Sequence, residues 1–142
     1  MAVTARNVRA LNEAETRTFV AGGTVNMGDA VYVDSAGKVQ QARANAAATS
    51  EAIGIVIAVA QPGATAAASG EAVEVCVFGP VGGFSSLTPG AVQYLSDATA
   101  AALVETAPSG AGKWAKAVGR ADSAGIVFVL PGVVAARSSG VA

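Results

Sequence analysis

Residue types that most enzymes use for catalysis are scarce in this chain. Its 142 residues include no histidine and a single cysteine, Cys76. Histidine is the commonest general base, the usual activator of a serine or cysteine nucleophile, and the commonest metal ligand. Cys76 falls in an apolar stretch, where a free cysteine usually acts as a small buried hydrophobic residue. We therefore expect no metal, no cofactor and no catalytic residues.

Two short motifs look like parts of enzyme sites. Residues 109–113, Ser-Gly-Ala-Gly-Lys, are similar to the end of a phosphate-binding loop. Such a loop needs a glycine five residues before its second glycine and Ser or Thr after the lysine, but this chain has Ala107 and Trp114 there. Ser35 and Lys38 have the Ser-x-x-Lys spacing of acyl-serine enzymes, but they fall in an expected turn. We interpret both motifs as chance matches.

Carboxylate pairs are the last catalytic option, because glycosidases use two acids that converge across a cleft. Glu71 and Glu74 point to opposite faces of an expected strand, since side chains alternate along a strand. Trp114 lies between Lys113 and Lys116 and could form a small cationic and aromatic spot. We favour the alternative, in which Trp114 covers the end of a barrel.

Residues 27–39 form the stretch around which the chain is organised. They predict a strand, a tight turn and a return strand, and the turn at residues 34–37 has the Asp-first, Gly-fourth pattern of a type I turn. A continuous β-branched run at residues 53–59 predicts a strand that is covered on both faces. Residues 70–79 predict the next strand, with Val73 and Val75 on one face.

Short sequence patterns from these stretches recur later in the chain. Gly28 and Tyr32 are matched by Gly90 and Tyr94, each 62 residues further on. Residues 52–54, Ala-Ile-Gly, are matched by 117–119, Ala-Val-Gly, and the run 73–79 by the run 126–132. Two interpretations stay open: a duplicated β unit, or all-β sequence that reuses Gly and Tyr at strand starts.

Short strands separated by Gly, Pro and Ser turns every 8–12 residues predict an all-β fold. We expect an antiparallel β-barrel or a jelly-roll-like sandwich, built from two similar β units if the repeat is real. The single β domain is assigned to residues 22–132, an extended N-terminal arm to residues 1–21, and a flexible tail to residues 133–142. The arm is mostly polar, and we expect its residues 1–17, which have too little apolar surface to join the core, to be dispensable for folding. Its arginines are the candidate contacts to a partner or a neighbouring subunit: Arg6, Arg9 and Arg17.

The composition favours a subunit of an assembly. Charged residues make up only 13% of the chain and the net charge is −1, whereas a nucleic-acid-binding protein would carry a basic surface. We expect a homo-oligomer, a trimer in preference to a dimer, because the apolar strand faces need cover. We expect no signal peptide, since residues 1–20 lack a continuous apolar core, and no membrane partner, since no apolar run approaches the roughly 20 residues of a membrane-spanning helix.

The order of these short sequence patterns resembles that in the small capsid decoration (cement) and head-fibre proteins of tailed bacteriophages. A Gly-x-x-Val-Tyr strand, an Ile-Gly strand and a closing apolar strand recur in that family, and the resemblance covers roughly residues 25–131. The stretches that carry it are 28–33, 52–56, 70–75, 90–95, 112–113, 117–121 and 126–128.

The resemblance implies a structural virion protein that binds the outside of the capsid, has no catalytic residues and stabilises the shell. Its partners would be the major capsid protein and further copies of itself, and it would be made in the host cytoplasm. The alternative is a phage fibre or adhesion module that binds a host receptor or glycan through an aromatic pocket formed by Tyr32, Tyr94 or Trp114. A small enzyme is the third hypothesis.

Overall fold

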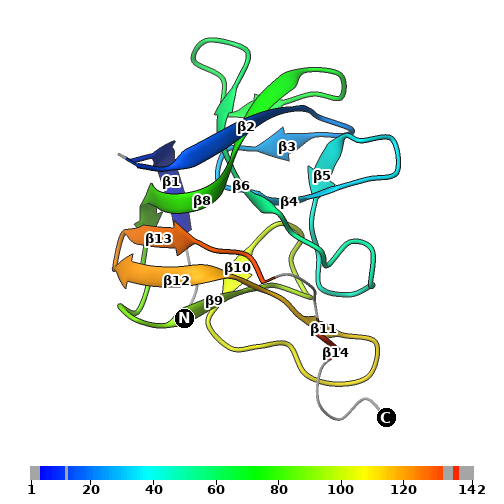
Figure 1. Ribbon diagram of the computed structural model, residues 1–142, viewed down its shortest axis with the longest axis vertical. Helices are drawn as coiled ribbons and strands as arrows, with labels where there is room; N and C mark the ends of the chain where they lie inside the picture. Colours follow the sequence, from blue (N-terminus) through cyan, green and yellow to red (C-terminus); the bar gives the residue numbers. More distant parts are fainter. Residues whose placement is uncertain (1–3, 12, 133–135, 138–142) are drawn as a thin grey trace.

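The computed structural model describes residues 4–11, 13–132 and 136–137, and the part that it describes is all β and antiparallel, as the sequence predicts. Figure 1 shows two groups of strands, one above the other, with β8 passing between them. The strands are β1 (Thr4–Ala10), β2 (Glu15–Val20), β3 (Val25–Asn26), β4 (Ala30–Val33), β5 (Val39–Gln41), β6 (Gly54–Val59), β7 (Ala66–Ala67), β8 (Ala72–Ser85), β9 (Val92–Leu95), β10 (Leu103–Val104), β11 (Trp114–Ala115), β12 (Ala117–Ser123), β13 (Ile126–Val129) and β14 (Ala136–Arg137).

The long strand β8 joins the two groups. Its first half lies between β6 and β2, and its second half lies between β13 and β1. The main sheet runs in the order β10-β9-β12-β13-β8-β6-β4-β5. It curls into a half-barrel, which agrees with the predicted fold class.

The pairing pattern supports the duplicated unit. We define the first repeat as β2, β4, β5, β6 and residues 72–78 of β8, and the second repeat as residues 79–85 of β8 with β9, β10, β12 and β13. Strand order is β5-β4-β6-β8-β2 in the first repeat and β10-β9-β12-β13-β8 in the second. A β-bulge follows Val56 in one repeat and Ala121 in the other. Three cross-strand pairs of the first repeat have a counterpart in the second. Val31–Gly54 corresponds to Gln93–Gly119, Ile55–Cys76 corresponds to Arg120–Phe128, and Val33–Val39 corresponds to Leu95–Leu103.

One detail of the sequence alignment is wrong. Aligning the run 73–79 with the run 126–132 would make Val75 the counterpart of Phe128. The hydrogen-bonded ladders instead make Cys76 the counterpart of Phe128 and Val75 the counterpart of Val127. The error is one residue, and in a strand a shift of one residue exchanges the two faces.

Two apolar clusters hold the layers together. The first cluster lies between the repeats and joins Ile55 and Cys76 of the first repeat to Val118 and Val127 of the second. The second cluster covers the other face of the first repeat and contains Val31, Val39, Val56, Val73 and Val75. Strand β6 is therefore covered on both faces, as predicted, and Val73 and Val75 do share one buried face.

The N-terminal segment is extended, as predicted, but it is part of the sheet. Strand β1 pairs with the second half of β8, and β2 pairs with the first half. Val8 is 2% exposed and belongs to the first cluster. The expectation that residues 1–17 have too little apolar surface to join the core is wrong, because one buried valine and backbone pairing are enough to fix a polar strand. Of the predicted tail, only residues 136–137 are described, as β14 beside β11; the others lie outside the described residues.

In each repeat a carboxylate accepts a hydrogen bond from a backbone N–H, and the two N–H groups, of Asn26 and Thr88, are at equivalent positions. In the first repeat Asp29 Oδ2 lies 2.8 Å from the nitrogen of Asn26. In the second repeat Glu105 Oε2 lies 2.8 Å from the nitrogen of Thr88, and Glu105 also accepts from the Thr88 hydroxyl and from Gln93 Nε2, both at 2.9 Å. These hydrogen bonds lower the pKa of Glu105, and the bond from the Thr88 N–H has the largest effect. For Asp29, in contrast, desolvation by burial raises the pKa.

Glu105→Gln should lower the melting temperature at neutral pH, because a neutral amide accepts these bonds less strongly than a carboxylate. The pKa of Glu105 is lower in the folded state than its ordinary value of 4.5, so its stabilisation is present above that value and is lost as the pH falls through the folded pKa. The difference in melting temperature from wild type should shrink at acid pH. Glu74→Gln, at an exposed strand position, is the control. A constant difference across the pH range would contradict the prediction.

Candidate functional site

The outer face of the second repeat is half-buried or exposed at positions that the first repeat buries. In the first repeat, Ala30, Ile55 and Cys76 are 0% exposed and Ile57 is 8% exposed, because the second repeat packs over them. Their counterparts in the second repeat are Val92, Arg120, Phe128 and Asp122, and no described residue of this chain packs over that face to bury it in the same way.

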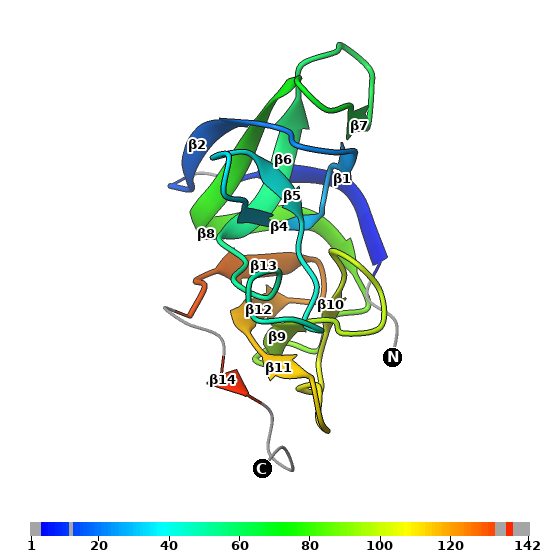
Figure 2. The ribbon, with the colours of Figure 1, turned by 90° about the vertical axis from the view of Figure 1, so that its right-hand side faces the viewer.

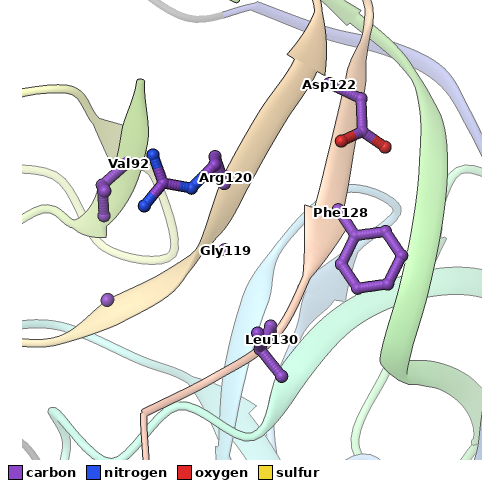
Figure 3. Close-up of a pocket in the computed structure, with 7 residues that line it drawn as sticks. Val92, Gly119, Arg120, Asp122, Phe128 and Leu130 are labelled. Carbon is purple, nitrogen blue, oxygen red and sulfur yellow. The ribbon is translucent and has the colours of Figure 1, made fainter. Parts of the chain in front are cut away.

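This face holds a shallow pocket of about 260 Å³. Figure 3 shows the pocket, with Phe128 and Leu130 on the β13 side and Arg120 reaching toward Val92 on β9. Gly119 also lines the pocket, and a Cβ added there would lie 2.2 Å from the carbonyl oxygen of Phe128. The lining residues are Val92, Ala117, Gly119, Arg120, Asp122, Phe128 and Leu130.

Exposed apolar side chains gather beside the pocket. Leu130 is 57% exposed and Phe78 is 41% exposed, and they are two of the four large hydrophobic residues that the described structure leaves exposed. Phe78 meets Phe128 edge to face, with ring centroids 5.2 Å apart. We call Phe78, Val92, Phe128 and Leu130 the outer patch. Such a surface suits the apolar centre of a protein interface.

Charged groups lie at the margin of the outer patch. Arg120 Nη1 donates to the carbonyl oxygen of Gly90 at 2.7 Å, which holds the guanidinium toward β9 and away from Phe128. Arg120 and Asp122 are both exposed. An apolar centre with a polar rim is the usual anatomy of a protein interface.

No protein-family model matches this chain, and a search of curated proteins gives no match. Among the described residues, no group of three or more His, Cys, Asp or Glu side chains is arranged to hold a metal ion. The same residues include no helix long and apolar enough to cross a membrane.

The predicted arginine contacts are not gathered at one place. Arg9 is exposed on β1 opposite Gly82, and Arg17 is exposed on β2 opposite Val75, so they flank different halves of β8. The guanidinium of Arg17 lies over the ring of Phe19, 5.2 Å from its centroid. Arg6 is within β1, and its side chain lies outside the described residues.

Other residues named from the sequence have structural partners. Trp114 is half-buried and packs against the first cluster. Lys113 pairs with Asp97 at 2.5 Å, which lowers the pKa of that carboxyl, and Lys116 pairs with Glu51 at 3.3 Å and is 2% exposed. Neither lysine forms a cationic spot with Trp114.

The Ser-x-x-Lys motif is an exposed turn, as predicted. Asp34 Oδ1 accepts from the backbone nitrogens of Ala36 and Lys38, at 2.9 and 3.0 Å. Ser35 and Lys38 are both exposed, whereas acyl-serine chemistry needs a desolvated lysine beside the serine. Cys76 is buried, and burial raises the pKa of its thiol, which makes it a poor nucleophile.

The outer patch was missed by reasoning from the sequence. In the sequence, Phe78, Phe128 and Leu130 are typical residues of apolar strands. The alternation of side chains along a strand does not show which face is exposed. The available signal was the repeat, since two stacked units leave one outer face without a third unit to cover it. Charged Arg120 and Asp122, where the first repeat has isoleucines, mark which face that is.

Proposed function

We propose that this chain is a structural virion protein that binds the outside of a bacteriophage capsid and stabilises the shell. The resemblance in sequence supplies the class of partner, the major capsid protein. The observation that carries the proposal is the outer patch: a face that is buried in the first repeat is left open in the second. A partner that covers Leu130 and Phe78 would complete the pattern.

Burial of apolar surface supplies the binding energy in this account. Each square ångström of apolar surface removed from water contributes about 25 cal/mol, and aromatic side chains often dominate interface energetics. A ligand that binds only the assembled shell stabilises it by mass action. If several copies act together as a homo-oligomer, a trimer in preference to a dimer, multivalency strengthens the attachment.

The outer patch favours a protein partner, and the resemblance in sequence supplies the remaining parts of the proposal. The centre of this patch is apolar and its rim holds one Arg and one Asp, so it suits protein better than nucleic acid or an anionic membrane surface. The chain would act without a cofactor and without catalysis. It would be made in the host cytoplasm and lie on the capsid exterior in the virion.

The fibre or adhesion module is a weaker second candidate, supported by a polar pocket of about 460 Å³. Gln40 and Gln41 in this pocket already donate to Asp34 and Asp29. A glycan array with the isolated chain tests this candidate directly. The pocket lining contains no aromatic ring on which a sugar could stack: Gly23, Thr24, Gln40, Gln41, Arg43, Asn45, Thr49 and Ala100.

Leu130→Asp should weaken retention on purified empty capsids of the phage that encodes the chain by about tenfold or more, the loss expected at an interface hot spot. Val33→Asp is the matched control, because Val33 is also an exposed large apolar residue, 40% exposed, in the first repeat. Both variants should melt close to wild type, and only Leu130→Asp should lose co-sedimentation. Equal retention of Leu130→Asp and wild type would refute the outer patch as the capsid contact.

A further inference from the structure

A pocket of about 240 Å³ lies where the two repeats meet, and we call it the Asp29 pocket. Its walls are residues 27–29, which precede β4, and residues 100–103, which lead into β10 and begin it. Figure 2 shows the loop between β9 and β10 reaching from the lower group of strands toward β4. A single water molecule needs roughly 15 Å³ of such space, so the pocket is large enough for a side chain.

Ala101 holds one wall of the pocket in place. Its N–H donates to the carbonyl oxygen of Ala42 at 2.6 Å, and its carbonyl oxygen accepts from the N–H of Ala30 at 3.0 Å. Ala101 is buried and has a φ of +64°, an unfavourable conformation for a residue other than glycine, which the surrounding contacts maintain. The wall is therefore formed in advance, and a ligand would not have to order it on binding.

Asp29 brings a carboxylate without a cationic partner to the pocket. Its Oδ2 accepts from the N–H of Asn26 at 2.8 Å and from Nε2 of Gln41 at 2.7 Å, and Nδ2 of Asn26 lies 3.4 Å away. These donors are uncharged, and no ion pair among the described residues includes Asp29. Burial raises the pKa of Asp29 although the hydrogen bonds act to lower it, because desolvation disfavours the charged form. A cation beside the carboxylate would offset this cost.

The second oxygen of this carboxylate, Oδ1, is available to a ligand. It accepts no hydrogen bond from a described residue. Among the described side chains, the only buried polar atom without a partner is Oε1 of Gln93, so Oδ1 of Asp29 reaches solvent. Because Asp29 lines the pocket, Oδ1 is the acceptor that a bound cation would use.

The pocket suits an ammonium group better than other cations. Ca²⁺ takes about six to eight oxygen ligands, but no group of three or more acidic, His or Cys side chains in the described part of the chain is arranged to hold a metal. A guanidinium binds best to both oxygens of a carboxylate, and Oδ2 is already occupied. An ammonium can use Oδ1 alone, and the methylene chain of a lysine packs well along apolar residues such as Met27 and Leu103.

We propose that the Asp29 pocket binds the ammonium group of a lysine side chain presented by a partner protein. The ammonium lies at Oδ1 of Asp29, and its methylene chain packs along Met27 and Leu103. No residue of the outer patch lines this pocket, so the site is separate from the proposed capsid contact and does not depend on it. A charge-assisted hydrogen bond in a half-buried pocket fixes the orientation of the partner and adds specificity.

Titration of the isotope-labelled chain with n-butylammonium chloride, followed by NMR of the backbone amides, tests the site. The amides of Gly28, Asp29 and Ala101 should shift saturably, with a dissociation constant in the millimolar range expected of so small a ligand. n-Butanol has the same chain without the charge and should bind at least about tenfold more weakly. Calcium chloride at the same ionic strength should give no saturable shift at these amides. Saturation by calcium, or equal binding of n-butanol, would overturn the proposal.

Asp29→Asn should weaken binding of n-butylammonium by at least about tenfold, because it removes the charge. Its amide oxygen can still accept from Asn26 and Gln41, so this variant should melt close to wild type. Asp122→Asn, at an exposed position, is the matched control and should bind like wild type. Equal binding by the two variants would overturn the proposal. If Asp29→Asn does not fold, the comparison of n-butylammonium with n-butanol on wild type still decides the question.

A blocked lysine distinguishes a protein ligand from a free amine. Nα-acetyl-lysine N-methylamide carries the ammonium on a backbone like that of a partner protein, and it should shift the same amides with an affinity similar to that of n-butylammonium. The same compound acetylated at Nε has no charge and should not bind. If n-butylammonium binds and the blocked lysine does not, the pocket takes free amines, and the proposed protein partner is wrong.

Discussion

Gly54→Ala should destabilise the folded protein by more than about 3 kcal/mol, beyond the roughly 1–3 kcal/mol that overpacking usually costs. An added Cβ would lie 2.1 Å from the carbonyl oxygen of Cys76 and 2.9 Å from Cγ1 of Val75. The oxygen belongs to the backbone of the neighbouring strand, so it cannot move without breaking the ladder between β6 and β8. The expected drop in melting temperature is about 10 °C or more, or loss of soluble protein.

Gly119→Ala tests the same contact in the second repeat, where the Cβ would lie 2.2 Å from the carbonyl oxygen of Phe128. Gly23→Ala is the control, since its Cβ would have only one neighbour, at 3.7 Å. Melting followed by circular dichroism should place both strand variants well below wild type and Gly23→Ala within a few degrees of it. If Gly54→Ala melts with Gly23→Ala, the close approach of β6 to β8 is wrong.

These two glycines explain why much of the fold was predictable. Gly54 and Gly119 occupy the same place in two copies of one ladder, and the sequence repeats the phrase around them. Gly28 and Gly90 also match, and both have positive φ, +93° and +84°, which other residues adopt at a cost. A repeated steric requirement leaves repeated glycines, so the sequence alone indicated the duplication.

The first strands left no such signal. Strand β2 has the sequence Glu-Thr-Arg-Thr-Phe-Val and corresponds to the glycine-rich second half of β8. The two segments have no identical residue at corresponding positions. Exposed edge strands lack the alternation that burial imposes, and their pairing with a strand some 60 residues away depends on the completed sheet. The outer patch was hidden for a related reason: which face stays uncovered depends on how the repeats stack.

A chain that begins at Thr18 should fail to fold, in contrast to the sequence expectation that residues 1–17 are dispensable. The deletion removes β1, Val8 of the first cluster and the start of β2. The second half of β8 then loses its neighbour β1, and the first half loses the beginning of β2. Each buried backbone group left unpaired costs about 1–3 kcal/mol, and several such losses exceed the 5–15 kcal/mol stability of a typical domain.

The full chain with Arg9→Ala and Arg17→Ala separates a structural role of this segment from a tethering role. It keeps both strands, so it should melt near wild type, and loss of retention on capsids would assign binding to these arginines. The truncated chain should instead show no cooperative melting, weak near-ultraviolet circular dichroism and binding of a hydrophobic dye, because the first cluster is opened. Cooperative melting of the truncated chain at the wild-type temperature would show that pairing of β1 and β2 with β8 contributes nothing to stability. In that case the segment would act only as an arm.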